Sequence, residues 1–399
     1  MVVVPDWTGD IPGHHAAHPV RPPFSHPTAP TAGLTTTPSF KVIIPAIIKS
    51  IVKDQDLPIA RGSLRFTSPT HMVMSMDTML DTPLGVHIDP MALGLYHSDT
   101  ASDTPFLTLE IPSQHISGET VVAIPEQEVE VTDEAQLTAW FSDFFSDQQT
   151  TPLRAVAHGL TARLGALTYS VDLDKTIAVP ALRHLAGFTL VDMAFAIPPG
   201  ADGNNVRGVL SIPNAGVLAI GLGTLGFYLQ AGEVVIGEVF VNDLELRPGN
   251  NTPTFQGQFY FDRLMPNIAA ILDSQTAVGA LAEGYVELNV TGSEALVGPG
   301  GAVIPSITSV LRRKTLSLRV PIMTLLGDVL SGLLAGAGSD GAPQGRLLDI
   351  VGEVVGNSTL MGGVMDHWES AAAGEKKKRS LQMDLLRLGL RGAMKGGRW

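Results

Sequence analysis

The chain has 399 residues, of which 44% are hydrophobic and 16% are charged, so it is long enough to form two or three domains with sizeable cores. The formal net charge of −13 argues against general nucleic-acid binding, and the absence of cysteine excludes disulfides, thiolate catalysis and cysteine-type zinc sites. No run of about 18 apolar residues predicts a membrane-spanning helix, and the apolar start "MVVVP" is too short for the core of a signal peptide.

Residues 1–39 are rich in Pro, His, Thr and Ala and lack helical or strand periodicity, so they are predicted to be a disordered lead-in. His14, His15 and His18 are close enough to bind a metal ion, but flexible flanks favour an incidental cluster over a metal site. Residues 40–57, which begin "FKVIIPAIIKSIVKD", place apolar residues at helical spacing and predict a short helix.

From about Ile59 onward, short runs of alternating apolar and polar residues are separated by Gly, Pro, Asn and Asp. Examples are "HMVMSM", "GEVFVNDLEL" and "TFQGQFYF". Alternation of this kind is typical of antiparallel sheets with one buried face. The fold class is therefore predicted to be mainly β, with tandem antiparallel β-sandwiches and short connecting helices.

An internal repeat divides this region. "LGLY" at 93–96 recurs as "LGFY" at 225–228, and "DQQTTPLRAVAHG" at 147–159 recurs as "DSQTAVGALAEG" at 273–284. The repeat predicts a first β-sandwich unit at 58–184 and a second at 185–315.

Each predicted unit contains a proline turn and a helix. The turns are "FTSPT" and "LSIPN", and the helices are "DEAQLTAWFSDFF", with Asp133 as N-cap, and "DRLMPNIAAILDS".

Beyond these units, "LSLRVPI" predicts the first strand of an incomplete third unit, which together with a Gly-rich region occupies 316–370. The tail at 371–399 carries eight Lys or Arg and two acidic residues, with "KKKR" ahead of a leucine-rich helical stretch. Three readings of the tail stay open: contact with an anionic membrane, a nuclear signal, and a solvated tail.

Gly221, Gly223 and Gly226 have the G-x-G-x-x-G spacing of a dinucleotide-binding loop. A true fingerprint must open a helix whose N-terminus holds the pyrophosphate, but "FYLQAGEVVIGEVFV" follows here, in which Gly232 and Gly237 interrupt any helix. The glycines are therefore predicted to mark bulges or close backbone approaches within a sheet, and no cofactor is expected.

Other catalytic patterns are weak. Asp172 and Asp174 in "VDLD" share one face of a predicted strand, where two carboxylates could bind a cation, although a solvated strand face is the favoured interpretation. Six histidines are scattered singly, with no nucleophile at a readable spacing: His71, His87, His97, His115, His158 and His184. The sequence accordingly predicts no catalytic residue and no metal site.

Three N-x-S/T sequons are glycosylation candidates, at Asn250, Asn289 and Asn357. Asn250 lies in a predicted turn, "RPGNNTP", where an acceptor would be exposed. Asn289 lies in an apolar predicted strand and is expected to be a poor acceptor.

"IIPAIIKSIVKDQDLPIARGSLRFTSPT" and "GFTLVDMAFAIPPGADGNNVRGVLSIPNAG" resemble the fungal family built around domain of unknown function 3712. The resemblance, over residues 40–325, implies immunoglobulin-like β-sandwiches similar to the group-two late embryogenesis abundant (LEA-2-like) fold. It also implies single-pass proteins of the vacuolar or endomembrane system with tandem lumenal domains, and it brings no catalytic residues. The membrane-spanning helix expected before Lys41 is missing, which leaves a soluble cytoplasmic paralogue or a lost exon as alternatives.

We therefore expect a non-enzymatic binding or structural protein with an unidentified protein or lipid partner and no nucleic-acid partner. The alternative is a protein that binds lipid or another hydrophobic ligand, with the apolar, Gly-laced strands of the second unit opening a pocket. An enzyme such as a hydrolase, using Asp172 and Asp174 or an isolated histidine, is the third hypothesis.

Overall fold

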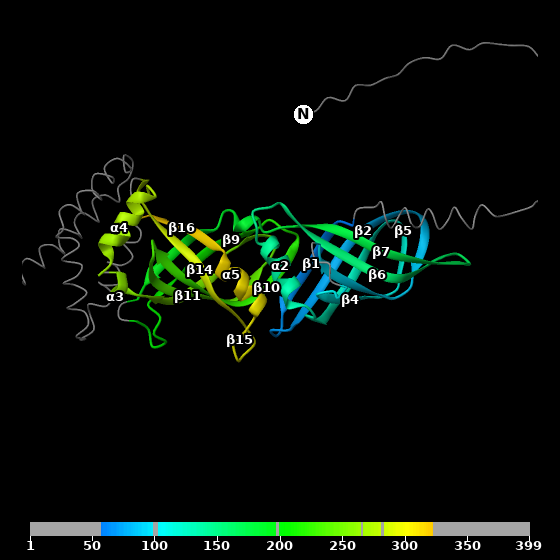
Figure 1. Ribbon diagram of the computed structural model, residues 1–399, viewed down its shortest axis with the longest axis horizontal. Coiled ribbons are helices and arrows are strands. Elements are labelled where there is room, and N and C mark those ends of the chain that lie inside the picture. The colour runs from blue at the N-terminus through cyan, green and yellow to red at the C-terminus, as the bar shows by residue number, and fades with distance from the viewer. Residues whose placement is uncertain (1–56, 99–102, 197–198, 265, 281–282, 322–399) are drawn as a thin grey trace, which may run out of the picture. The chain divides into compact units, whose positions relative to one another are not determined.

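The computed structural model describes residues 57–98, 103–196, 199–264, 266–280 and 283–321, all within one compact unit (Figure 1). These residues are mainly β, and their strands join into one large sheet that is antiparallel except where β1 meets β10. The prediction of a mainly β fold with antiparallel strands is confirmed. The lead-in, the histidine cluster, the helix predicted before Leu57, the Gly-rich region and the basic tail lie outside the described residues.

In the N-terminal half, residues 57–180, two groups of strands face each other across the core. β2 pairs with β1 and β5, β3 pairs with β4 and β6, and β6 pairs with β7. The two groups are joined where Ile88 of β2 meets Ala162 of β6. The elements are β1 (Ile59–Phe66), β2 (His71–Ile88), β3 (Met91–His97), β4 (Leu107–Ile111), β5 (Gln114–Glu130), α2 (Glu134–Phe144), β6 (Thr150–Leu164) and β7 (Leu167–Pro180).

The C-terminal half, residues 189–321, follows the short 3-10 turn η1 (Arg183–Leu185). Its elements are β8 (Thr189–Phe195), β9 (Val206–Asn214), β10 (Leu218–Ala231), β11 (Val234–Leu246), β12 (Gly249–Asn251), β13 (Thr254–Phe259), α3 (Phe261–Leu264), α4 (Ile268–Ala277), β14 (Tyr285–Val297), β15 (Ala302–Val303), α5 (Pro305–Arg313) and β16 (Thr315–Pro321). β16, which the sequence assigned to an incomplete third unit, pairs with β14 along its length and so lies within this half.

The two halves share one pairing scheme. Five antiparallel pairs in the N-terminal half, β1–β2, β2–β5, β3–β4, β3–β6 and β6–β7, have counterparts in β8–β9, β9–β13, β10–β11, β10–β14 and β14–β16. In this scheme β3 corresponds to β10, and these strands carry the repeated "LGLY" and "LGFY". The second predicted repeat is not in register, because 147–159 runs into β6 whereas 273–284 covers the end of α4 and the turn before β14.

One predicted turn proves to be a strand. "FTSPT" forms the turn between β1 and β2 as expected, but "LSIPN" is the last part of β9, where Pro213 lies opposite Asn250 of β12. Proline is tolerated at that position because it is close to the strand end, beside a partner strand of only three residues.

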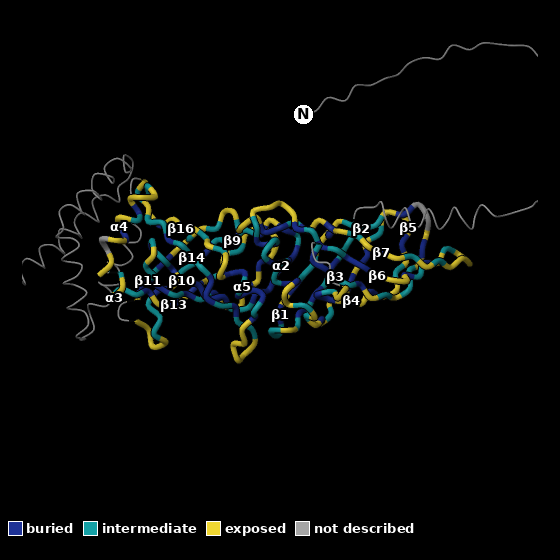
Figure 2. The backbone as a smooth tube through the Cα atoms, in the orientation of Figure 1, coloured by how far each residue is buried: buried dark blue, intermediate teal, exposed yellow. Residues whose placement is uncertain are grey.

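Strict alternation explains why the strands form here. β4 and β13 bury every second residue, so each strand turns one apolar face toward a core and one polar face toward solvent. Figure 2 shows buried residues running through the interior of both halves. Burying one such Leu, Val or Phe side chain stabilises the fold by about 1.5–3 kcal/mol, and dozens of them form one connected core.

Helix α2 is capped by Asp133, as predicted, and its Trp140, Phe141 and Phe144 are buried among aromatic rings from its own turns and from the sheet. α2 packs against α5, and β1 pairs in parallel with β10 from Gly62 to Arg65. The halves are therefore joined by backbone pairing and by helix packing (Figure 1).

The glycines of the G-x-G-x-x-G spacing lie inside β10, and no helix follows them. A Cβ atom at Gly221 would meet the Arg65 side chain of β1 at 2.7 Å, and Gly223 has a φ of +71° beside the Leu296 carbonyl. The register of β10 against β11 shifts on both sides of Gly223. The prediction that these glycines mark a bulge and close backbone approaches is confirmed.

Candidate ligand cavity

An apolar cavity of about 130 Å³ lies inside the N-terminal half, with residues from all seven strands in its wall. The lining residues are Leu57, Ile59, Met76, Thr78, Leu80, Thr82, Val86, Ile88, Met91, Leu93, Ile111, Gln114, Ile116, Val122, Ile124, Ala155, Leu160, Ala162, Leu173 and Ile177. We call this space the N-terminal cavity.

The wall offers an occupant almost nothing but hydrocarbon. The Thr78 hydroxyl donates to the Pro58 carbonyl at 2.9 Å, and the Gln114 amide donates to the Ala123 carbonyl at 3.3 Å. A cavity of comparable size lined by Leu, Ile and Phe stays dry and binds benzene or xenon. Left empty, 130 Å³ costs about 3 kcal/mol at roughly 24 cal/mol per Å³, which an apolar ligand would recover.

Small side chains on β6 contribute to this space. Ala155 and Ala162 are both about 1% exposed and both face the cavity. β4 and β5, which are not paired, are linked by Gln127: its side-chain amide donates to the Glu110 carbonyl at 2.9 Å and accepts from the Glu110 N–H at 2.8 Å. These two side-chain hydrogen bonds connect β4 to β5 although the two strands share no backbone ladder.

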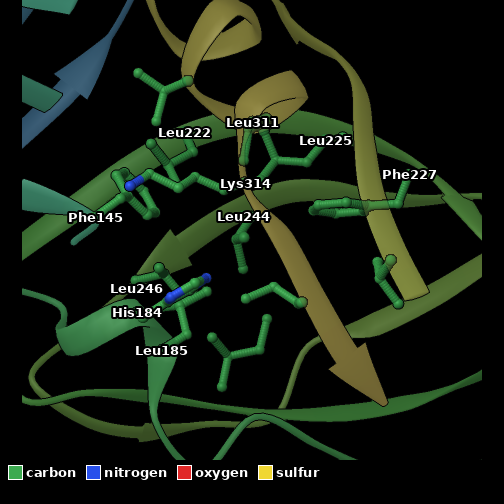
Figure 3. Close-up of a pocket in the computed structure, with 15 residues that line it drawn as sticks. Phe145, His184, Leu185, Leu222, Leu225, Phe227, Leu244, Leu246, Leu311 and Lys314 are labelled. Carbon is green, nitrogen blue, oxygen red and sulfur yellow. The ribbon is translucent and has the colours of Figure 1, made fainter. Parts of the chain in front are cut away.

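The core of the C-terminal half has a far smaller apolar space, about 30 Å³, shown in Figure 3. A larger and more open depression of about 380 Å³ lies at the surface of this half, and its lining includes Asp192, Arg207 and Asn242. Leucines and Phe227 from β10 and β11 fill most of this interior, and Leu311 of α5 closes over it. Gly292 of β14 has no room for a Cβ atom because Leu311 lies against it. The enclosed apolar cavity therefore lies in the first predicted unit, whereas the hypothesis placed an apolar pocket in the second.

Helix α5 accounts for the difference between the halves. It is inserted between β14 and β16, whereas their counterparts β6 and β7 are joined by a two-residue turn, Gly165–Ala166. The C-terminal half therefore has a helix between the last two strands of the shared scheme, whereas α2, the helix packed on the core of the N-terminal half, comes before β6.

Strained backbone lies beside the smaller space. Arg183, His184 and Leu185 of η1 all have φ near +50°, a conformation that costs a non-glycine residue about 1–2 kcal/mol. The turn is held to the end of α2 by Leu182 N–H, which donates to the Phe144 carbonyl at 2.9 Å, and by His184 N–H, which donates to the Ser146 carbonyl at 2.8 Å. His184 and Leu185 contribute to the wall of this space together with Lys314 (Figure 3).

The predicted carboxylate pair lies on the outer face of β7. Asp174 accepts two hydrogen bonds of 2.8 Å from Arg154, and this guanidinium lowers the pKa of Asp174. Asp172 accepts from the Gly159 N–H at 2.8 Å. Both residues are exposed, as the favoured interpretation of a solvated strand face predicts.

Other groups whose pKa is shifted also lie away from both spaces. Hydrogen bonds from the side chain and backbone of Gln136 lower the pKa of Asp133, Arg247 lowers that of Glu245, and burial raises that of Tyr260. None of these groups lines either space, and no cluster of three His, Asp or Glu suited to a metal ion occurs among the described residues.

Two of the three sequons can be placed. Asn250 is exposed in β12, where its side chain accepts from the Ser211 hydroxyl. Asn289 lies in β14 with β10 on one side and β16 on the other, so a glycan there would have to form on a central strand. Asn357 lies outside the described residues.

The fold and the cavity define a mainly β protein with two similarly paired halves, of which the first encloses apolar space. Residues 104–229 match the family described as "Protein of unknown function (DUF3712)", which supports the resemblance found in the sequence. The match runs from the residues before β4 into β10 and so covers the end of the N-terminal half and the start of the C-terminal half. No curated protein matches the chain, and no helix of the described residues is long and apolar enough to span a membrane.

Proposed function

We propose that the protein is a non-enzymatic binding protein whose N-terminal half is a β-sandwich module that holds a small hydrophobic ligand. The N-terminal cavity carries this proposal: it is enclosed by strands and lined almost wholly by apolar side chains. Ligand sites are generally concave and mostly apolar with a few placed polar groups, and this cavity has that character.

The C-terminal half, in the same proposal, serves as a structural partner. Its interior is filled by α5 and by the large side chains of β10 and β11, and it supports β1 through the parallel pairing with β10. A rigid β1 keeps Ile59 in place as part of the cavity wall.

The test is isothermal titration calorimetry of the full chain with benzene, an uncharged apolar probe that a cavity of about 130 Å³ can hold. We expect saturable binding at one site per chain. In Ala162→Leu the added carbons occupy the cavity, so probe affinity should fall at least tenfold while the melting temperature stays the same or rises.

Ala166→Leu is the matched control, because it adds the same atoms at an exposed turn. It should bind the probe as the wild type does. The proposal is overturned if the wild type shows no saturable binding, if Ala162→Leu binds normally, or if Ala162→Leu melts at a lower temperature, as an overpacked core would.

A further inference from the structure

The depression of about 380 Å³ at the surface of the C-terminal half lies where β8, β9, β11 and β13 meet, and we call it the surface depression. Five polar side chains line it, and all five residues are exposed: Asp192 on β8, Arg207 on β9, Asn242 on β11, and Thr254 and Gln256 on β13. Ligand sites commonly measure about 300–1,000 Å³, so the surface depression is large enough for a small molecule.

The depression opens where a strand ladder ends. β11 and β13 are paired as far as Phe240 and Gln256, and their pairing stops there. β13 nevertheless continues beside β9, with which it is paired through Thr254. The next outward residues of the two separated strands, Asn242 and Thr254, both line the depression. The hollow is therefore built into the sheet by the split between β11 and β13.

Two β-bulges flank this split. On β11, Asn242 and Asp243 stand opposite Thr224 alone, and Asp243 has a φ of +45°. On β8, Val191 is the extra residue ahead of Asp192. Bulges re-aim side chains and are frequent next to functional sites, where strained non-glycine backbone also clusters. Two of the five polar side chains are thus directed by local departures from regular strand geometry.

The polar groups of the surface depression are available to a ligand. None of the five side chains forms a hydrogen bond or an ion pair with another described residue, and this includes the oppositely charged Asp192 and Arg207 on neighbouring strands. The guanidinium only donates, the carboxylate only accepts, and the two amides and the hydroxyl do both. The depression therefore offers donors and acceptors side by side.

We infer that the surface depression binds a neutral saccharide, because each hydroxyl group of a sugar ring both donates and accepts hydrogen bonds. The single positive and single negative charge in the lining, on Arg207 and Asp192, cancel and favour neither an anion nor a cation. A phosphate group usually binds several cationic donors, and this lining has one. Ala194, Val209 and Phe255 supply apolar surface for the C–H groups of the ring. This site goes beyond the proposed function and does not depend on it.

The experiment is saturation-transfer difference NMR of the full chain with three neutral sugars, methyl β-D-glucopyranoside, methyl α-D-mannopyranoside and methyl β-D-galactopyranoside. We expect saturable binding of at least one of them. In Arg207→Met and in Asp192→Ala, the affinity for that sugar should fall at least about tenfold, because each substitution removes charge-assisted hydrogen bonds. The melting temperature should change little, since both side chains are exposed and make no bond within the described residues.

Arg313→Met is the matched control, because Arg313 is an exposed arginine of α5 that does not line the surface depression. It should bind the sugar as the wild type does. The inference is wrong if none of the three sugars binds saturably, or if either Arg207→Met or Asp192→Ala binds as the wild type does. Tighter binding of D-glucuronate than of the neutral glucoside would also overturn it, because the site would then select an anion. None of these results affects the proposed function, which benzene binding to the N-terminal cavity tests separately.

Discussion

At the scale of single residues, buried amide side chains substitute for backbone pairing where strands end. Asn214 is 2% exposed, and its side chain donates to the carbonyls of Leu218 and Leu246 and accepts from the Gly216 N–H, at 2.8–2.9 Å. It thereby joins the ends of β9, β10 and β11. The partly exposed Gln127 makes a similar link between β4 and β5 through the backbone of Glu110.

Asn214→Ala is expected to lower the free energy of unfolding by about 2–4 kcal/mol, because it leaves three buried backbone groups without partners. Urea denaturation followed by circular dichroism measures the change. Asn242→Ala, on the exposed side of β11, is the control and should stay within about 0.5 kcal/mol of the wild type. Equal effects of the two substitutions would contradict this role of Asn214.

At the scale of elements, α2 is set in place by its first turn. The Asp133 carboxylate accepts from the Gln136 N–H at 3.0 Å and from the Gln136 side chain at 2.7 Å, and that side chain also donates to the Thr104 carbonyl. The cap thus fixes the start of the helix and ties it to the chain ahead of β4. The aromatic residues of α2 then pack in a defined orientation between the sheet and α5.

Asp133→Ala is expected to lower the free energy of unfolding by about 1 kcal/mol at neutral pH. The pKa of Asp133 is lower in the folded state than in the unfolded state, so its charge adds to the free energy of unfolding. This stabilisation is fully present above the unfolded pKa near 4 and is lost as the pH falls through the folded pKa. Asp133→Asn keeps an acceptor for the Gln136 N–H but has no charge to titrate. Any stability difference between the wild type and Asp133→Asn at pH 7 should therefore shrink toward pH 3, and a constant difference would contradict the assignment.

At the scale of the whole described molecule, the parallel pairing of β1 with β10 makes the two halves interdependent. Gly62 lies at this contact, where a Cβ atom would meet a Leu218 methyl group and the Ser75 carbonyl, each at 2.8 Å. The joined sheet and the packing of α2 on α5 imply that the halves unfold together.

Gly62→Val is expected to lower the free energy of unfolding by about 1–3 kcal/mol, because the new side chain forces β1 away from β10. Differential scanning calorimetry should show a lower melting temperature and a broadened transition in place of a single sharp one. Gly85→Val is the control, since its nearest neighbours are 3.6 Å away and the strand favours a β-branched residue. An unchanged transition in Gly62→Val would show that the join does not couple the halves.

Features that depend on neighbours along the chain could be predicted. Alternating apolar residues indicated the strands, Asp133 marked the start of α2, and the residues after Gly226 showed that no nucleotide-binding helix begins there.

The sequence by itself determined which residues face a core, because periodicity along a strand directly encodes burial. Only the tertiary structure decided that β1 joins β10, that β16 completes the C-terminal half and that α5 fills it while the N-terminal half keeps a cavity. The first of these outcomes depends on contacts between residues far apart in the chain, as between Gly62 and Leu218, and the last depends on how side-chain volumes add up across facing strands. No local pattern records either quantity, so the place of the cavity emerges only when the strands are assembled.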